Sequence, residues 1–233
     1  MQKKLRIAII GAGIQGVCTA LFLQKKGFNV TLFDRDEPGN AASYGNAGHF
    51  SPYASLQLNR TDVLSDVPSM LLSSRGPLSL KWNYIPRMLP WFIKFVFNCS
   101  KTKMMHTAKY MHQILNLSLN AYDELFQDID LEGLVENNGI MYVWEKKGLK
   151  SRDLEINIRK KLGIDQQILT AKEIHDLEPN IKNIYHAGVF YKKARHARNP
   201  GKIWLKLFDL FLKKGGKFKK SNVQDINLIN ENP

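Results

Sequence analysis

Three glycines near the N-terminus have the spacing of a phosphate-binding turn. Gly11, Gly13 and Gly16 form the pattern G-x-G-x-x-G between an apolar run at residues 5–10 and a helix-like stretch at residues 17–26. In such a turn the first glycine permits a tight bend, the second lets the backbone approach a pyrophosphate, and the third lets the helix pack closely on the preceding strand. The amides at the start of the helix then face the anion. The spacing therefore predicts a nucleotide site built largely from the main chain.

An acidic residue follows at the position expected for the ribose of a dinucleotide. Residues 30–33 read as a second apolar strand, which ends at Asp34. A carboxylate about 20 residues past the glycines accepts hydrogen bonds from both ribose hydroxyls. It also repels a 2′-phosphate, so the pattern disfavours NADP and leaves NAD and FAD, which share the same adenosine diphosphate. An ordinary βαβ unit with an unrelated turn is the alternative.

The elements that must position this turn are predicted from both ends of the chain. Residues 5–10 form an apolar run of about six residues, shorter than the apolar core of a secretory signal. They are interpreted as a buried parallel strand, because a strand covered on both faces gives a continuous apolar run. Later, Asn199-Pro200 opens a helix that runs to Lys214, and residues 218–229 have strand character. Together these segments predict an α/β nucleotide-binding domain.

The middle of the chain predicts a second group of elements. Residues 104–129 carry apolar side chains at spacings of three and four, which predicts one long packing helix. Residues 140–145 and 187–193 read as strands. Two helical segments lie between these strands, and the second opens with the capping-box pattern of Thr170 and Glu173.

Composition excludes several classes of protein. The chain has 233 residues and 44% apolar content, which fits a soluble globular protein, and no apolar run reaches the roughly 18 residues of a membrane span. Cys18 and Cys99 are the two cysteines, so a disulfide framework is excluded and a reducing, cytoplasmic compartment is favoured. Cys18 is interpreted as a small core residue. His106 and His112 lie six positions apart rather than four, so no metal site is predicted.

The net charge of +13 is interpreted mainly as solvated lysines, and nucleic acid is not a predicted partner because no nucleic-acid motif accompanies the charge. The segment LPWFIKFVFNC is different, because it places an apolar stripe on a short helix. Core packing is the preferred interpretation of this stripe. Peripheral docking on the inner face of a membrane is the alternative, because basic residues flank the aromatic side chains. The stripe contains Trp91, Phe92, Phe95 and Val96, and the basic residues are Arg87, Lys94, Lys101 and Lys103.

The sequence of residues 39–53 distinguishes between NAD and FAD, the two remaining candidate cofactors. This stretch is rich in Gly, Ala, Ser and Asn, whereas a plain NAD domain would continue with a third apolar strand and helix. Here the sequence resembles the FAD-dependent D-amino-acid dehydrogenases within the wider D-amino-acid oxidase family. The resemblance runs along essentially the whole chain. It is carried by G-A-G-I-Q-G, Asp34-Arg35, Ser43 through Asn46-Ala47-Gly48, Leu177-Glu178-Pro179 and Asn199-Pro200.

The resemblance implies an α/β fold, with a Rossmann-like FAD-binding domain and an inserted α+β substrate domain. Residues 1–55 and 196–233 are the expected parts of the FAD-binding domain, the second part incomplete, and residues 56–195 are the expected substrate domain with a helical insertion. Val223 matches the family position whose backbone meets the adenine. By resemblance, the expected FAD-binding residues are Ile10, Gly11, Ala12, Gly13, Ile14, Gln15, Gly16, Asp34, Arg35, Ser43, Asn46, Ala47, Gly48 and Val223.

The resemblance also implies oxidative deamination of D-amino acids to keto acids and ammonia, with FAD as hydride acceptor and a quinone or another compound as electron acceptor. His49 and Tyr53 are either substrate contacts or hydrogen-bonded loop residues, and no catalytic residue is assigned. Family members continue beyond residues 230–233, which read as a hairpin turn, so we expect a C-terminally truncated chain with an open sheet edge after Val223 and little activity by itself. A nicotinamide-dependent dehydrogenase and an inactive or split fragment are the alternatives.

Overall fold

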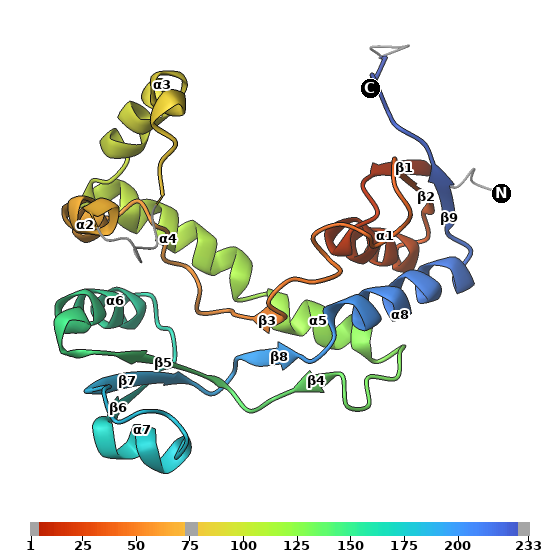
Figure 1. The fold of residues 1–233 in the computed structure, drawn as a ribbon. Coiled ribbons are helices and arrows are strands. Elements are labelled where there is room, and N and C mark those ends of the chain that lie inside the picture. Colours follow the sequence, from red (N-terminus) through yellow and green to blue (C-terminus); the bar gives the residue numbers. More distant parts are fainter. Residues whose placement is uncertain (1–4, 73–78, 228–233) are drawn as a thin grey trace. The chain divides into compact units, whose positions relative to one another are not determined.

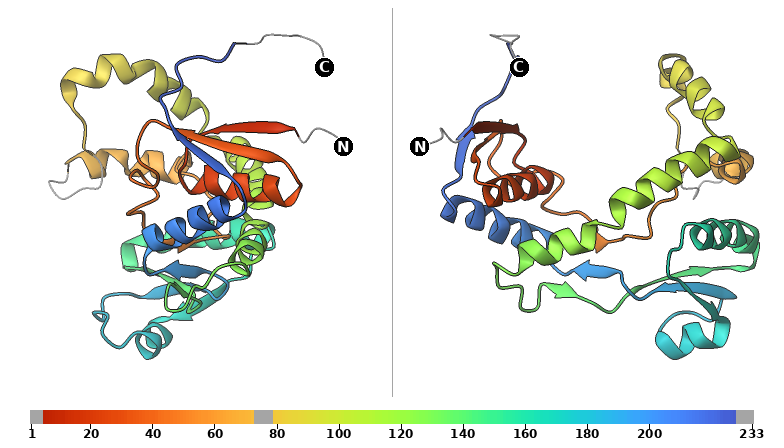
Figure 2. Two further views of the ribbon diagram at one scale, coloured as in Figure 1. Left: turned by 90° about the vertical axis from the view of Figure 1, so that its right-hand side faces the viewer. Right: turned by 180° about the vertical axis from the view of Figure 1, so that it is seen from behind.

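A computed structural model describes residues 5–72 and 79–227 of the chain and divides it into two compact units. Unit 1 comprises Met1–Phe50, Asn120–Asn137 and Arg195–Pro233, and unit 2 comprises Ser51–Leu119 and Asn138–Ala194. Figures 1 and 2 show the elements of both units. The predicted domain limits at residues 55 and 195 lie near this division, but they do not separate residues 120–137, which pack with unit 1.

Unit 1 contains a parallel three-stranded sheet in the order β1-β2-β9. The strands are β1 (Arg6–Ile10), β2 (Asn29–Asp34) and β9 (Lys217–Lys220). Helix α1 (Ile14–Lys25) connects β1 to β2, and helix α8 (Pro200–Lys213) leads into β9. Figure 1 shows these red and blue segments side by side. The α/β domain predicted from both ends of the chain is thereby confirmed.

Strand β1 lies at an edge of this sheet and is not the covered strand that its apolar run predicts. Ile10 is 57% exposed, and exposed and half-buried residues alternate along the strand. Among the described residues β1 pairs with β2 alone. An apolar run indicates that a strand is compatible with a buried position. Whether the strand is buried depends on neighbouring elements, which the sequence of the strand does not specify.

Strand β9 is shorter than the strand predicted at residues 218–229. It ends at Lys220, and residues 221–227 have no strand structure. The reason is that β2 ends at Asp34, whose carbonyl accepts from the amide of Ser221 (2.7 Å), so the ladder has no further partner residues. Val223 therefore lies beyond the sheet. The hairpin turn predicted at residues 230–233 lies outside the described residues.

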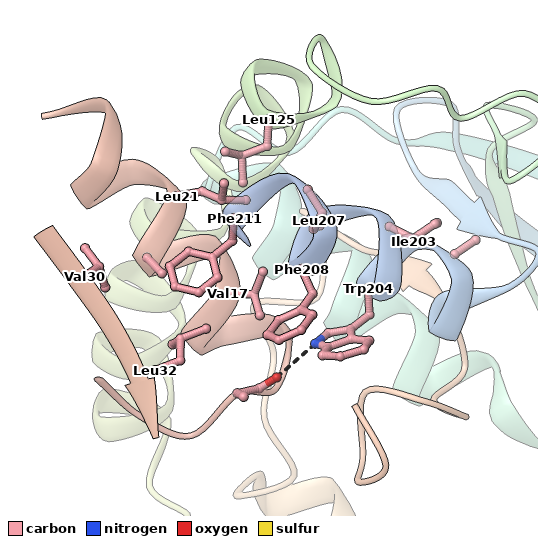
Figure 3. Packing of buried hydrophobic residues seen from close by; sticks show 13 residues of the cluster. Val17, Leu21, Val30, Leu32, Leu125, Ile203, Trp204, Leu207, Phe208 and Phe211 are labelled. Carbon is pink, nitrogen blue, oxygen red and sulfur yellow. Dashed lines mark hydrogen bonds between the residues drawn. The ribbon is translucent and has the colours of Figure 1, made fainter. Parts of the chain in front are cut away.

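The core of unit 1 is formed where α1 and α8 pack on the sheet (Figure 3). Val17 and Leu21 of α1 are buried against Phe211 of α8, and Leu32 of β2 completes this part of the cluster. The buried residues of both helices recur at spacings of three and four, which is the period of a helix with one apolar face. This packing fixes the start of α1, where the glycine turn lies.

Two helix starts predicted from sequence are confirmed by their caps. The Asn199 side chain accepts from the amide of Lys202 (2.9 Å) at the start of α8. The Thr170 hydroxyl accepts from the amide of Glu173 (3.3 Å), and the Glu173 carboxylate accepts from the amide of Thr170 (2.8 Å). This reciprocal pair is the predicted capping box, which starts helix α7 (Ala171–Leu177).

A small antiparallel sheet in unit 1 follows the loop after β2. Its order is β3-β8-β4, with β3 at His49–Phe50, β8 at Arg195–Ala197 and β4 at Val135–Glu136. The carbonyl of Gly48 accepts from the amide of Ala197 (2.7 Å), which extends the pairing by one residue. The sheet therefore anchors the end of the loop that runs from β2.

Unit 2 is built on an antiparallel sheet in the order β5-β7-β6. The predicted strands are confirmed as β5 (Ile140–Trp144) and β7 (Ala187–Tyr191), whereas β6 (Gln167–Thr170) is an element that the sequence pattern did not predict. Helices α6 (Leu149–Lys161) and α7 are the two predicted between the strands. Unit 2 also contains two 3-10 turns, at Trp82–Tyr84 and Lys146–Gly148, and the helices α2 (Thr61–Leu72), α3 (Ile85–Phe97) and α4 (Lys101–Leu115). Most of α5 (Ser118–Phe126) belongs to unit 1.

Two expectations for the helices are wrong. The helix predicted at residues 104–129 is two helices, α4 (Lys101–Leu115) and α5 (Ser118–Phe126), because the chain breaks at residues 116–117 although the apolar spacing continues across them. The apolar stripe at residues 91–96 lies on α3 (Ile85–Phe97), and none of the thirteen residues of α3, all described, is buried. Core packing is therefore not the role of this helix in the structure.

Candidate dinucleotide site

The glycine turn has the geometry that its spacing predicts. Gly11 has φ +107°, a left-handed conformation that favours glycine, and its amide donates to the carbonyl of Phe33 (2.7 Å). A Cβ on Gly16 would lie 1.9 Å from the carbonyl oxygen of Gly11, so α1 can sit this close to β1 only without a side chain there. A Cβ on Gly13 would lie 3.2 Å from the Ser43 hydroxyl, so the loop after β2 lies directly against the turn.

The amino end of α1 is suited to an anion. Gly13 is the N-cap residue and provides no side-chain cap, and the first turn of α1 contains no acidic residue. The amide of Ile14 donates to the hydroxyl of Ser43 (2.9 Å), which is 9% exposed. No acidic side chain in the first turn of α1 thus compensates the positive end of the helix dipole. A bound phosphate would supply the negative charge.

Asp34 connects the end of β2 to this turn. Its Oδ2 accepts from the amide of Ala12 (2.7 Å), and its Oδ1 accepts from the amide of Asp36 (3.1 Å). These hydrogen bonds, the one from Ala12 above all, hold the pKa of the Asp34 carboxyl below its usual range. The carboxylate is therefore ionised at neutral pH and keeps lone pairs for further donors, which is what recognition of ribose hydroxyls requires.

Hydrogen bonds tie Asp34 and Ser43 to the glycine turn, whereas other predicted residues bond within their own segments. The Arg35 side chain pairs with Asp36 (3.2 Å) at the surface, and the Asn46 side chain accepts from the amide of Gly48 (2.7 Å). Of the rest, Ala12 is buried and Ile14 is half-buried. The exposed ones are Ile10, Gln15, Asn46 and Ala47. Gly48 is buried with φ +67°, and Val223, beyond the end of β9, is half-buried.

Trp204 of α8 supports the turn, a role that no local sequence pattern predicts. Its indole Nε1 donates to the carbonyl of Ala12 (3.0 Å), drawn as the dashed line in Figure 3. A Cβ on Gly39 (φ +81°) would lie 2.4 Å from the Trp204 ring, so this ring also packs against the loop after β2. A buried indole requires an acceptor, but no local signal identifies one that lies 192 positions away along the chain.

The two residues predicted as substrate contacts or loop residues have different environments. His49 of β3 in unit 1 is exposed, and its ring lies edge-on to that of His196 (centroids 5.3 Å apart). Tyr53 in unit 2 is 2% exposed and stacks on Tyr191 (3.8 Å between centroids). Its hydroxyl lies 3.4 Å from that of Tyr142, and burial is the main cause that raises the pKa of Tyr53. The structure thus makes Tyr53 a packing residue of unit 2.

The described residues contain no cluster of three or more His, Cys, Asp or Glu side chains that would hold a metal ion. Cys18 packs against the core of unit 1, as predicted, and burial raises its pKa to about 12. Burial also raises the pKa of Cys99. The helices described here are all too short or too polar to cross a membrane.

Comparison with known proteins identifies the family. The model of the FAD-dependent oxidoreductase family matches residues 6–232. A D-amino-acid oxidase of Bradyrhizobium diazoefficiens is 32% identical over 231 residues, which are 98% of this chain and 55% of that protein. D-amino acid dehydrogenase 2 of Ralstonia nicotianae is 30% identical over 183 residues, which are 75% of this chain and 42% of that protein. The chain spans about half the length of these relatives.

Solved structures share the fold. Glycine oxidase from Bacillus cereus aligns with a TM-score of 0.57 at 19% identity, over 98% of this chain and 49% of that one. L-alpha-glycerophosphate oxidase from Mycoplasma pneumoniae, determined with FAD bound, aligns with a TM-score of 0.57 at 15% identity, over 94% of this chain and 45% of that one. Since the family model covers almost the whole chain, this protein belongs to the family of FAD-dependent oxidoreductases.

Proposed function

We propose that the turn of Gly11, Gly13 and Gly16 binds the adenosine diphosphate half of FAD. The observation that supports this most directly is the amino end of α1, which has neither a side-chain cap from Gly13 nor an acidic residue in its first turn, next to an ionised Asp34. In this proposal the α1 amides donate to the pyrophosphate, Asp34 accepts from the ribose hydroxyls, and the hydroxyl of Ser43 keeps its place beside Ile14.

The reaction that we propose for the complete protein is oxidative deamination of D-amino acids. When bound, FAD supplies the hydride acceptor: the amine loses a hydride from its α-carbon and a proton from its nitrogen, and water hydrolyses the resulting imine to a keto acid and ammonia. The contribution of this chain is to hold one end of the cofactor through backbone amides and the Asp34 carboxylate. The sheet of unit 2 is proposed as part of the substrate domain. The names of the two relatives support this substrate class.

The other proposed residues and partners follow from the same resemblance. We also propose FAD contacts by residues that lie outside the glycine turn. These residues are Arg35, Asn46, Ala47, Gly48 and Val223. A quinone or another electron acceptor, a cytoplasmic location and a peripheral contact with the inner face of the membrane are also part of the proposal. Turnover of a panel of D-amino acids with a dye acceptor and added FAD tests the reaction, and failure of turnover with intact FAD binding favours an inactive or split fragment.

Cofactor binding by the isolated chain is the sharper test. Titration with FAD is followed by calorimetry for the parent, Asp34→Ala, Gly13→Val and the control Asp209→Asn, which changes an exposed carboxylate of α8. Asp34→Ala removes charged hydrogen bonds worth about 1.5–3 kcal/mol each, so we expect binding at least about tenfold weaker. Gly13→Val places a side chain where the pyrophosphate approaches. FAD affinity equal to that of the parent in both variants would refute the site, and preference for NAD over FAD would favour the nicotinamide alternative.

A further inference from the structure

The longest stretch of the chain without an acidic side chain surrounds helix α3. Residues 67–122 contain seven Lys and Arg side chains and no Asp or Glu. The basic residues are Arg75, Lys81, Arg87, Lys94, Lys101, Lys103 and Lys109. The sequence of this stretch thus carries charges of one sign only, and such a segment favours an anionic partner.

Helix α3 has one half-buried apolar side and one exposed apolar side. The half-buried residues are Ile85, Met88, Phe92 and Phe95, which share one face at helical spacing. The exposed apolar residues are Pro86, Leu89, Pro90, Ile93, Val96 and Phe97, which occupy about a third of the circumference at 3.6 residues per turn. Four of them are 49–72% exposed. An apolar face of this kind is unusual on a helix of a water-soluble unit and marks an interaction surface.

The charged side chains of α3 lie beside this exposed face. Arg87 and Lys94 lie about two turns apart on one side of the helix, with Trp91 between them, and all three are exposed. The Arg87 guanidinium lies over the ring of Tyr84 (5.9 Å to its centroid), and Trp82 just before the helix is 75% exposed. Apolar side chains bordered by basic and aromatic ones are the pattern of a helix that lies in the plane of a membrane interface. Figure 1 shows α3 as the yellow helix that leads into α4.

We propose that α3 docks this protein on an anionic lipid surface. Leu89, Ile93 and Phe97 enter the boundary between headgroups and acyl chains, while Arg87 and Lys94 contact lipid phosphates. A second copy of the chain is the less favourable occupant, because a symmetric contact would bring these cations together. Helix α3 would thereby be the surface that makes the membrane contact of the proposed function, with anionic lipid as its ligand. It is independent of the flavin site, so its test does not use FAD binding.

Vesicle flotation tests the proposal with the whole chain. The vesicles contain either phosphatidylcholine alone or phosphatidylcholine with phosphatidylglycerol. We expect binding to the anionic vesicles, weakened by salt because exposed charges are screened. Each basic residue near an anionic surface contributes about 1 kcal/mol, so the double variant Arg87→Gln/Lys94→Gln should bind roughly 25-fold more weakly. The variant Ile93→Ser/Phe97→Ser should lose at least about tenfold in affinity, because it removes apolar area from the interface.

The control variant is Lys160→Gln/Lys161→Gln, which makes the same change in net charge at two exposed lysines of α6. Its binding should match that of the parent within about twofold. Absence of flotation, equal flotation with neutral vesicles, or an equal loss in the control would each overturn the proposal. So would a dimer in solution that Ile93→Ser/Phe97→Ser dissociates. Circular dichroism verifies folding, and if the serine variant fails to fold, the exposed charge pair decides the matter.

Discussion

At the scale of single residues, Asp34 has a structural task besides the proposed recognition of ribose. Its Oδ2 is the acceptor for the amide of Ala12, a residue with no exposed surface, so this buried donor depends on the carboxylate. The fingerprint predicts the acid at this position, but it does not predict that the acid also holds the turn. A loss of cofactor binding in an Asp34 variant is therefore interpretable only beside a measurement of stability.

We predict that Asp34→Ala lowers the free energy of unfolding at pH 7 by about 1–3 kcal/mol, because a buried amide loses its partner. Asp34→Asn should lose less, since an amide oxygen still accepts. The pKa of Asp34 is lower in the folded state than its unfolded value of about 3.9. The ionised form therefore contributes stability above that value, and the contribution is lost as pH falls through the folded pKa. Urea unfolding at pH 7 and pH 3 measures the difference, which should shrink in acid.

The control for this measurement is Asp36→Asn, which changes a carboxylate two positions away at the surface. Its effect at pH 7 should stay within about 0.5 kcal/mol. A pH-independent loss of stability in Asp34→Ala, or an equal loss in Asp36→Asn, would contradict the assigned hydrogen bond.

At the scale of elements, the close approach of α1 to β1 depends on Gly16. We predict that Gly16→Ala destabilises unit 1 by about 1–3 kcal/mol, although alanine is the better helix former, because the new Cβ would lie 1.9 Å from the carbonyl oxygen of Gly11. The control Thr19→Ala changes an exposed position of the same helix and should be neutral or stabilising. Thermal unfolding compares the two variants. A Gly16→Ala protein as stable as Thr19→Ala would contradict the packing described here.

Local patterns predicted those elements whose structure depends on local interactions. The glycine turn, the caps at Asn199 and Thr170 and the strands β5 and β7 follow from spacing and residue type. The break between α4 and α5 could not be predicted in this way, because the apolar spacing of three and four continues unchanged across it. Strand β6 is four residues long with one buried side chain, too little for a periodicity. The contact between Trp204 and Ala12 depends on tertiary packing, and no local signal specifies it.

At the scale of the whole molecule, the two edges of the β1-β2-β9 sheet differ in character. Strand β9 has the sequence KFKK, and lysines on an edge strand oppose pairing with another chain. Strand β1 has the sequence RIAII and exposes Ile10. The edge expected to be vulnerable from the sequence was the one after Val223. The structure places the unprotected apolar edge at β1, at the other side of the sheet.

We predict that the chain self-associates through the open edge of β1. The carbonyl of Leu5 accepts a hydrogen bond from β2, and the amide of Gly11 donates one to β2. Along a strand of a parallel sheet, every second residue bonds to the same neighbour, so the odd-numbered residues of β1 face β2. The amide of Ala8 therefore faces the open edge. Ala8→Pro removes that donor and should lower the association measured by sedimentation. Lys220→Pro is the control, because it places a proline at an outward amide of the lysine-rich edge. Association unchanged in Ala8→Pro, or lowered equally in the control, would mean that another surface joins the molecules.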